Sequence, residues 1–213
     1  MIKTTFDIVK DYLEIFYYLT AGPLLAFLAF KGLSQIKVSR EIAKMNAKRE
    51  AFKISAEQCN VFADKICGLA KKFQEEQKGN KFFDKFKIEI TGNNIKTQLV
   101  GKLTDEEIKQ INESKYFLDL LNSLEGFALY FVSRVASEQV GFVTTGKAYC
   151  ELVTDLMPLI IDEFSDGYYK NISVLFMTWN NRLTKEKLEF EKKEIERKLT
   201  KTPTRQILPI GTE

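Results

Sequence analysis

The stretch IFYYLTAGPLLAFLAF, from Ile15 to Phe30, is the part of this chain around which the rest must be arranged. It holds sixteen residues without a formal charge, and Lys31 closes it. As an α-helix it is about 24 Å long, shorter than the ~30 Å hydrocarbon core of a bilayer. Residues 12–14 and 31–33 extend the span toward the ~20 residues needed, with Glu14 and Lys31 reaching toward the headgroups. The sequence therefore predicts a single-pass transmembrane anchor near the N-terminus.

A buried core helix is the alternative for an apolar run of this length. Pro23 lies in the middle of the run and favours the membrane, where proline is tolerated better than in soluble helices. Tyr12, Tyr17 and Tyr18 near one end suit an interfacial aromatic belt. The predicted anchor residues are Ile15, Phe16, Leu19, Pro23, Leu24, Leu25, Phe27, Leu28 and Phe30.

The charges on the two sides of the run differ. Acidic and basic residues nearly cancel before it, whereas basic residues dominate after it. The positive-inside rule then predicts an inner-membrane protein with its C-terminal part in the cytoplasm. Residues 1–14 lack the basic start and cleavage pattern of a signal peptide, so we expect the span to be retained. The residues expected to meet anionic lipid headgroups are Lys31, Lys37, Arg40 and Lys44.

The composition excludes several classes of chemistry. The chain has 213 residues and no histidine, which removes the usual general base and the commonest neutral metal ligand. Its three cysteines, Cys59, Cys67 and Cys150, are too few and too widely spaced for a disulfide framework. No phosphate loop or dinucleotide fingerprint occurs. A net charge of +3 is too mild to imply nucleic acid, so we expect neither cofactor, metal nor nucleic-acid partner.

A heptad pattern begins directly after the anchor. From Ser34 to about Lys78, apolar residues recur at alternating spacings of four and three, which predicts a long helix with a seam for a partner helix. A coiled-coil homo-oligomer, a cytoplasmic partner protein and an intramolecular bundle all remain open. Arg49 interrupts the seam, either to set the register or simply to reach solvent. The assembly seam comprises Val38, Ile42, Met45, Arg49, Phe52, Ala56, Cys59, Ala63, Ile66, Ala70 and Phe73.

The helical pattern stops between Lys78 and Gly101. Alternating apolar residues on both sides of Thr91–Asn94 predict a small β-hairpin near residues 84–100, with an irregular loop as the alternative. Thr104 and Glu107 form a capping box that opens the next helix.

We expect that helix to run to Gln139 or Val140, with a bend near Asn112, and to end at Gly141. A further helix is expected from about Thr145 to Phe164, containing Pro158, and a last one from Tyr168 to about Leu199. The fold class is thus mainly α, a transmembrane helix continuing into a long helix and a cytoplasmic helical bundle. The predicted domains are an anchor segment (1–33), a cytoplasmic helical domain (34–199) and a disordered tail (200–213).

Asn122 and Glu125 are the most unusual polar residues, because they lie one turn apart in the most apolar predicted helix. A buried carboxylate needs a partner, and the candidates are Arg134, Arg182 and Asn180. We expect a buried polar network that fixes helix register, with a catalytic or ligand-sensing site as the alternative. Acidic residues between Asp155 and Asp166 lie on differing helical faces, which favours a solvated surface over a metal site.

The segment LNSLEGFA, Leu121 to Ala128, is followed by Gly141 and by a helix containing Pro158. In these features the chain resembles a bacterial domain family of unknown function. Members typically have an N-terminal membrane span and a helical cytoplasmic region, and are sometimes met in mobile or defence-related loci. The resemblance implies a membrane-tethered helical protein and carries over no catalytic residue. The hairpin segment departs from the family pattern.

Three functions are compatible with the sequence. The first is a non-enzymatic, membrane-anchored helical scaffold or adaptor that self-assembles or docks a cytoplasmic partner. The second is a membrane-perturbing effector of a bacterial defence system, in which a short span with Pro23 reorganises by oligomerising. The third is a membrane-tethered enzyme using carboxylates around Glu125, which the absence of histidine disfavours.

Overall fold

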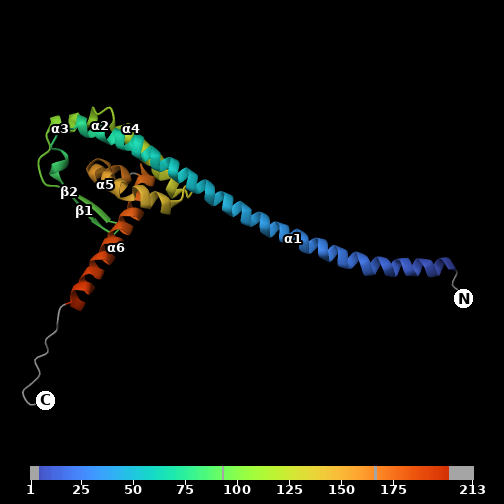
Figure 1. Ribbon diagram of the computed structural model, residues 1–213. Helices are drawn as coiled ribbons and strands as arrows, with labels where there is room; N and C mark the ends of the chain where they lie inside the picture. Colours follow the sequence, from blue (N-terminus) through green and yellow to red (C-terminus); the bar gives the residue numbers. More distant parts are fainter. Residues whose placement is uncertain (1–4, 93, 166, 202–213) are drawn as a thin grey trace, which may run out of the picture. The chain divides into compact units, whose positions relative to one another are not determined.

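The computed structural model describes residues 5–92, 94–165 and 167–201. They are mainly helical, with one small antiparallel sheet, as predicted. The chain divides into two compact units, Met1–Glu50 and Ala51–Glu213. The elements in chain order are α1 (Thr5–Val61), a π-helical turn η1 (Phe62–Ile66), α2 (Cys67–Glu76), a 3-10 turn η2 (Phe83–Lys85), β1 (Phe86–Thr91), β2 (Asn94–Leu99), α3 (Asp105–Asn112), α4 (Phe117–Val132), α5 (Glu138–Ser165) and α6 (Lys170–Lys201) (Figure 1).

The first unit consists of the N-terminal part of α1. The helix continues through Pro23, although the proline ring removes one backbone hydrogen bond. The hydroxyl of Thr20 donates to the carbonyl of Phe16 at 2.8 Å, so this polar side chain is satisfied within the helix. The predicted long helix from Ser34 to about Lys78 is present, but it contains the π-helical turn η1, which the heptad pattern does not indicate.

The second unit has an aromatic core. Trp179 of α6 is completely buried, and four rings surround it with centroid distances of 5.2–6.2 Å. These rings belong to Phe127, Phe131, Phe142 and Tyr149. The indole N–H of Trp179 donates to the carboxylate of Glu138 at 2.7 Å, so the one polar atom of this ring is paired.

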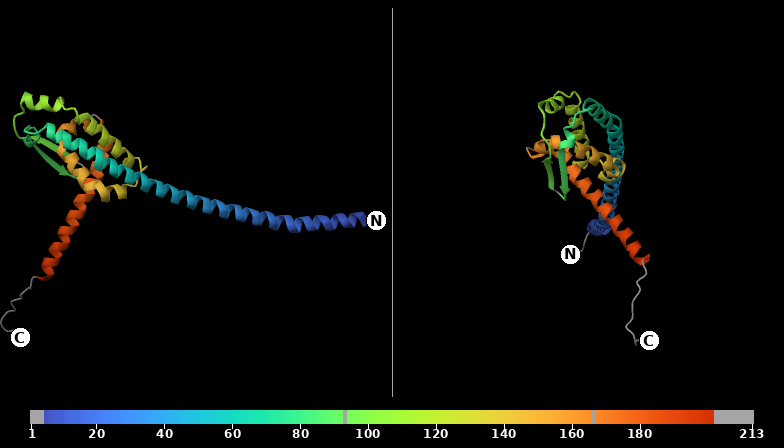
Figure 2. Two further views of the ribbon diagram at one scale, coloured as in Figure 1. Left: turned by 45° about the horizontal axis from the view of Figure 1, so that its top comes forward. Right: turned by 90° about the vertical axis from the view of Figure 1, so that its left-hand side faces the viewer.

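The predicted hairpin is confirmed. β1 pairs with β2 in an antiparallel register that places Phe86 opposite Leu99 and Thr91 opposite Asn94. A two-stranded sheet is not stable alone, so it must bury one face. The sheet lies against α5 (Figures 1 and 2). Ile88, Ile90 and Ile95 pack on the helical core.

The capping box at Thr104 and Glu107 is confirmed, but the single helix expected to follow it is wrong. The chain instead forms α3, α4 and the start of α5. A reversal separates α4 from α5: Arg134 takes a left-handed conformation with φ 63°, and the Ala136 N–H donates to the Tyr130 carbonyl at 2.9 Å. All three helices face the same core, so apolar residues continue across both interruptions. In the sequence, this continuous pattern looks like the apolar face of a single long helix.

Gly141 does not end a helix, contrary to the prediction. It lies within α5, which begins at Glu138 rather than near Thr145 and continues through Pro158. A Cβ atom at position 141 would lie 2.3 Å from the ring of Phe131, so glycine is required for the close approach of this ring. α6 is helical to Lys201, and the rest of the predicted tail, 202–213, lies outside the described residues.

Candidate functional site

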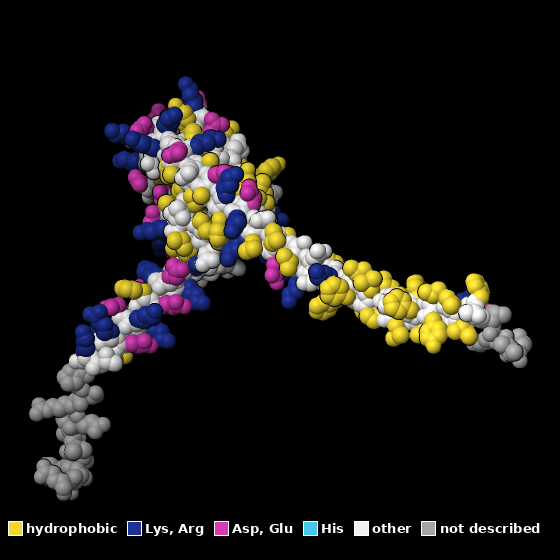
Figure 3. All heavy atoms as spheres, turned by 45° about the vertical axis from the view of Figure 1, so that its right-hand side comes forward, with side chains coloured by type: hydrophobic (Ala, Val, Ile, Leu, Met, Phe, Trp, Pro, Cys, Tyr) yellow, Lys and Arg dark blue, Asp and Glu magenta, His cyan; other side chains and the backbone are white. Residues whose placement is uncertain are grey.

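The predicted anchor residues form a fully exposed apolar surface on α1. The exposed fractions of the eight large side chains lie between 55% for Leu28 and 74% for Phe30, and Pro23 is also exposed. Figure 3 shows apolar side chains gathered toward the N-terminal end of this helix. Among the described residues, one helical segment, Thr5–Glu76, is long and apolar enough to cross a membrane.

The four predicted headgroup residues, Lys31, Lys37, Arg40 and Lys44, are exposed. The ammonium group of Lys31 lies 5.4 Å from the centre of the Phe27 ring, so its stem follows the helix back toward the apolar run. This is the arrangement by which a lysine covers apolar surface with its methylene groups while its charge remains available.

The predicted seam falls into two parts. Cys59, Ile66, Ala70 and Phe73 are buried in the core of the second unit, where η1 and α2 pack against α4. This part therefore pairs within the chain. The other seam residues are exposed: Val38, Ile42, Met45, Arg49, Phe52, Ala56 and Ala63.

The flanks of the exposed seam carry both signs of charge. With Val38, Met45 and Phe52 at one core position of the heptad, the flanking positions include Glu41, Lys48 and Lys53. The ammonium group of Lys53 lies 4.0 Å from the carboxylate of Glu57. In a parallel pair of identical helices, Lys48 of one copy would face Lys53 of the other. The repulsion between these like charges disfavours a second copy as the partner.

Glu125 is half-buried, and its partners lie at the start of α6. One carboxylate oxygen accepts from the backbone N–H of Asn171 at 3.2 Å and from its side-chain amide at 2.6 Å. The other accepts from the backbone N–H of Ile172 at 3.0 Å. These N–H groups have no partner inside α6, so Glu125 of α4 caps the N-terminus of α6. The tyrosine hydroxyl of Tyr149 donates to the Ile172 carbonyl at 3.1 Å and holds the same turn.

The prediction that Asn122 is buried beside Glu125 is wrong, because Asn122 is exposed on the outer face of α4. Of the three expected partners, Arg182 instead lies against the Phe142 ring at 3.9 Å and pairs with Glu138 at 3.7 Å. Sequence spacing places Asn122 and Glu125 near each other but does not show which face of the helix is covered. The partners of the Glu125 carboxylate are Asn171 and Ile172 at the start of α6, and the sequence did not indicate either of them.

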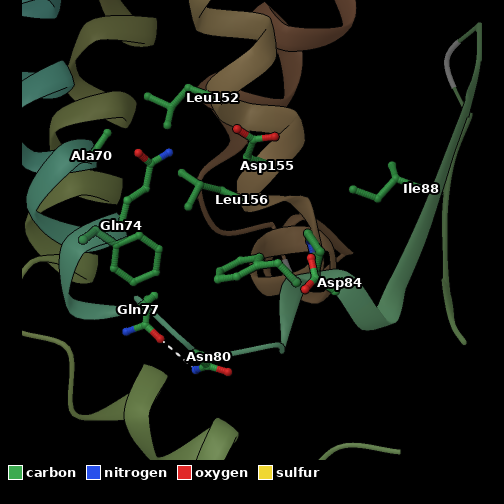
Figure 4. A pocket seen from close by; sticks show the side chains of 12 residues that line it. Ala70, Gln74, Gln77, Asn80, Asp84, Ile88, Leu152, Asp155 and Leu156 are labelled. Atoms are coloured by element: carbon green, nitrogen blue, oxygen red, sulfur yellow. Dashed lines mark hydrogen bonds between the residues drawn. The ribbon is translucent and has the colours of Figure 1, made fainter. Parts of the chain in front are cut away.

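A pocket of about 480 Å³ lies between α2, η2, β1 and α5 (Figure 4). Its apolar surface includes Phe73, Phe83 and Leu156, and its acidic groups are Asp84 and Asp155. Burial raises the pKa of the Asp155 carboxyl, and the nearby charge of Glu151 adds to this effect. Sequence reasoning missed this pocket because its residues come from separate segments that no spacing pattern connects.

The described residues hold no group of three or more His, Cys, Asp or Glu side chains that could bind a metal ion. The cysteines do not form a reactive centre either. Burial raises the pKa of the Cys150 thiol to about 12 and also raises the pKa of the Cys59 thiol and of the exposed Cys67 thiol. All three thiols therefore stay protonated at neutral pH, and thiolate is the nucleophilic form.

Comparison with protein-family models found no match, and comparisons with curated proteins and with solved structures found none either. The resemblance to a bacterial membrane-tethered family stays a prediction.

We expect Glu125→Ala to lower the free energy of unfolding by about 1–2 kcal/mol, because two N–H groups of α6 lose their acceptor. Glu125→Gln keeps one acceptor oxygen and should cost less. Urea unfolding of the full chain in detergent, followed by the fluorescence of the single tryptophan, Trp179, measures both. Asn122→Ala, on the exposed face of the same helix, serves as the control and should change stability by less than ~0.5 kcal/mol. Equal stability of Glu125→Ala and the unmodified protein would contradict the capping interaction.

Proposed function

We propose that this protein is a single-pass membrane-anchored helical adaptor with its folded C-terminal unit in the cytoplasm. The observation that carries the proposal is the exposed, uncharged surface from Ile15 to Phe30. A bilayer is the environment that such a surface fits, because each Leu, Ile or Phe at the centre of a membrane helix contributes about −0.3 to −0.6 kcal/mol. The basic residues that follow the run support a cytoplasmic location for the C-terminal unit.

An adaptor needs a surface for its partner, and the exposed seam residues Val38, Ile42 and Met45 provide one. Their exposed fractions are 52%, 48% and 54%. Three apolar residues at heptad spacing fit the apolar stripe of another helix. The like charges of Lys48 and Lys53, which would face each other in a parallel pair of copies, favour a cytoplasmic partner helix with acidic residues beside its stripe over a second copy of this chain.

The anchor is tested with Leu25→Lys together with Phe27→Lys. A lysine at the centre of a membrane helix costs about 2.5–3.5 kcal/mol, so two of them should offset the contribution of the whole apolar run. We expect the unmodified chain to stay in the membrane fraction during alkaline carbonate extraction and the double variant to be released. Leu188→Lys, an equally exposed position on α6, should stay membrane-bound. Release of the unmodified chain would contradict the proposal.

The docking surface is tested by a photo-crosslinking residue placed at Ile42 or, as the control on the opposite side of the helix, at Lys44. In native membranes we expect a discrete heterologous crosslink from position 42 and none from position 44. Lys53→Glu separates the two classes of partner. It should weaken the crosslink to an acidic helix, whereas it would strengthen pairing between copies by placing a carboxylate opposite Lys48. No crosslink from position 42, or equal crosslinks from both positions, would contradict the proposed docking surface.

A further inference from the structure

We propose that the pocket between α2, η2, β1 and α5 binds a small organic cation with an apolar body, such as an arylalkylammonium ion. The inference does not rest on the membrane anchor or on the exposed part of the seam. It uses only residues of the second unit, and its test has a separate readout.

The size and walls of the pocket suit a small molecule. Its volume of about 480 Å³ falls within the ~300–1,000 Å³ that small-molecule sites typically span. Phe73 and Leu156 at its base are almost completely buried, with exposed fractions of 3% and 2%. The rings of Phe73 and Phe83 meet edge to face at 6.1 Å, so the pocket offers both an apolar surface and aromatic faces.

The polar groups decide the charge of the ligand. Asp84 and Asp155 both line the pocket, and no lysine or arginine does so among the described residues. Within the described part of the chain, no ion pair or hydrogen bond joins either carboxylate to another side chain. Figure 4 shows Asp155 on α5 and Asp84 at the 3-10 turn bordering the same space. An ammonium group would supply the positive charge and the donors that these carboxylates lack.

The amide side chains at the bottom of the pocket are already engaged. Asn80 donates to the side-chain oxygen of Gln77 at 2.8 Å and to the Glu107 carbonyl at 3.1 Å. Gln77 in turn donates to the Gln110 carbonyl at 3.3 Å. These bonds fix the turn that closes the pocket, and they leave Gln74 as the exposed amide at its edge. The site is thus shaped before any ligand arrives.

The surroundings favour an organic cation over a metal ion. Divalent cations require six or more oxygen ligands, or fewer ligands with nitrogen and sulfur donors. The pocket offers two carboxylates among apolar and aromatic walls, and such walls stabilise the apolar body of an ammonium ligand. Asp84 and Asp155 are both exposed at this pocket, so a cation can reach their carboxylates from solvent, and desolvation by the surrounding residues raises the pKa of Asp155.

The test uses the full chain in detergent and three fluorinated probes: 4-fluorophenethylammonium, the neutral 4-fluorophenethyl alcohol and the anionic 4-fluorophenylacetate. Binding is followed by the ¹⁹F line width during titration with protein. We expect the cation to bind at least about tenfold more tightly than the alcohol, and the anion not to bind. Asp155→Asn should weaken cation binding by about tenfold while leaving alcohol binding unchanged.

Two further variants distinguish the pocket from the detergent and from unspecific charge effects. Gln74→Trp changes an exposed residue at the edge of the pocket and should block all binding by filling the space. Asp119→Asn removes an exposed carboxylate on α4, outside the pocket, and should leave cation binding unchanged. Circular dichroism confirms that each variant is folded. Equal binding of cation and alcohol, unchanged cation binding in Asp155→Asn, or no saturable binding of any probe would overturn the proposal.

Discussion

Water cannot accommodate a fully apolar helical surface without a large free-energy cost, and the stretch from Ile15 to Phe30 presents such a surface. Burying one Leu or Phe side chain is favourable by about 1.5–3 kcal/mol, and this stretch holds several of each with no charge among its sixteen residues. A proposal for this protein has to provide an apolar environment for it. The bilayer does so without any further protein component.

The folded unit that follows has a hydrophobic core of its own, which contains no residue of the apolar run. Trp179 and its aromatic neighbours supply the buried area, and among the described residues each polar side chain drawn into this core has a partner. Glu125 illustrates the principle. Its carboxylate lies at the start of α6, where unpaired N–H groups would otherwise be left without an acceptor. The same residue that suggests catalysis in the sequence therefore stabilises the packing of two helices.

Local chemistry made some elements predictable and left others hidden. The hairpin could be predicted because Gly92 lies between two alternating runs. The capping box could be predicted because the side chains of Thr104 and Glu107 define it. The break between α4 and α5 could not be predicted, because it depends on Arg134 taking a left-handed conformation. Such a conformation is rare for arginine and has no sequence signal.

The candidate sites divide in the same way. The apolar run from Ile15 to Phe30 is evident from composition alone, whereas its exposure and that of Asn122 depend on which helical faces the rest of the chain covers. The pocket near Asp155 depends on contacts of α2, η2 and β1 with α5, which lies far from them in the sequence. Tertiary packing, which a local pattern cannot report, decides both.

Hydrogen–deuterium exchange of the full chain in lipid nanodiscs distinguishes a membrane-embedded apolar run from one exposed to water. The segments 15–30 and 34–50 are both helical, and the rest of the chain covers neither of them. Helix formation alone would therefore protect the amides of the two segments to a similar degree. If the apolar run lies in the bilayer, its amides exchange far more slowly than those of residues 34–50. Equal exchange in the two stretches would contradict a membrane-embedded anchor.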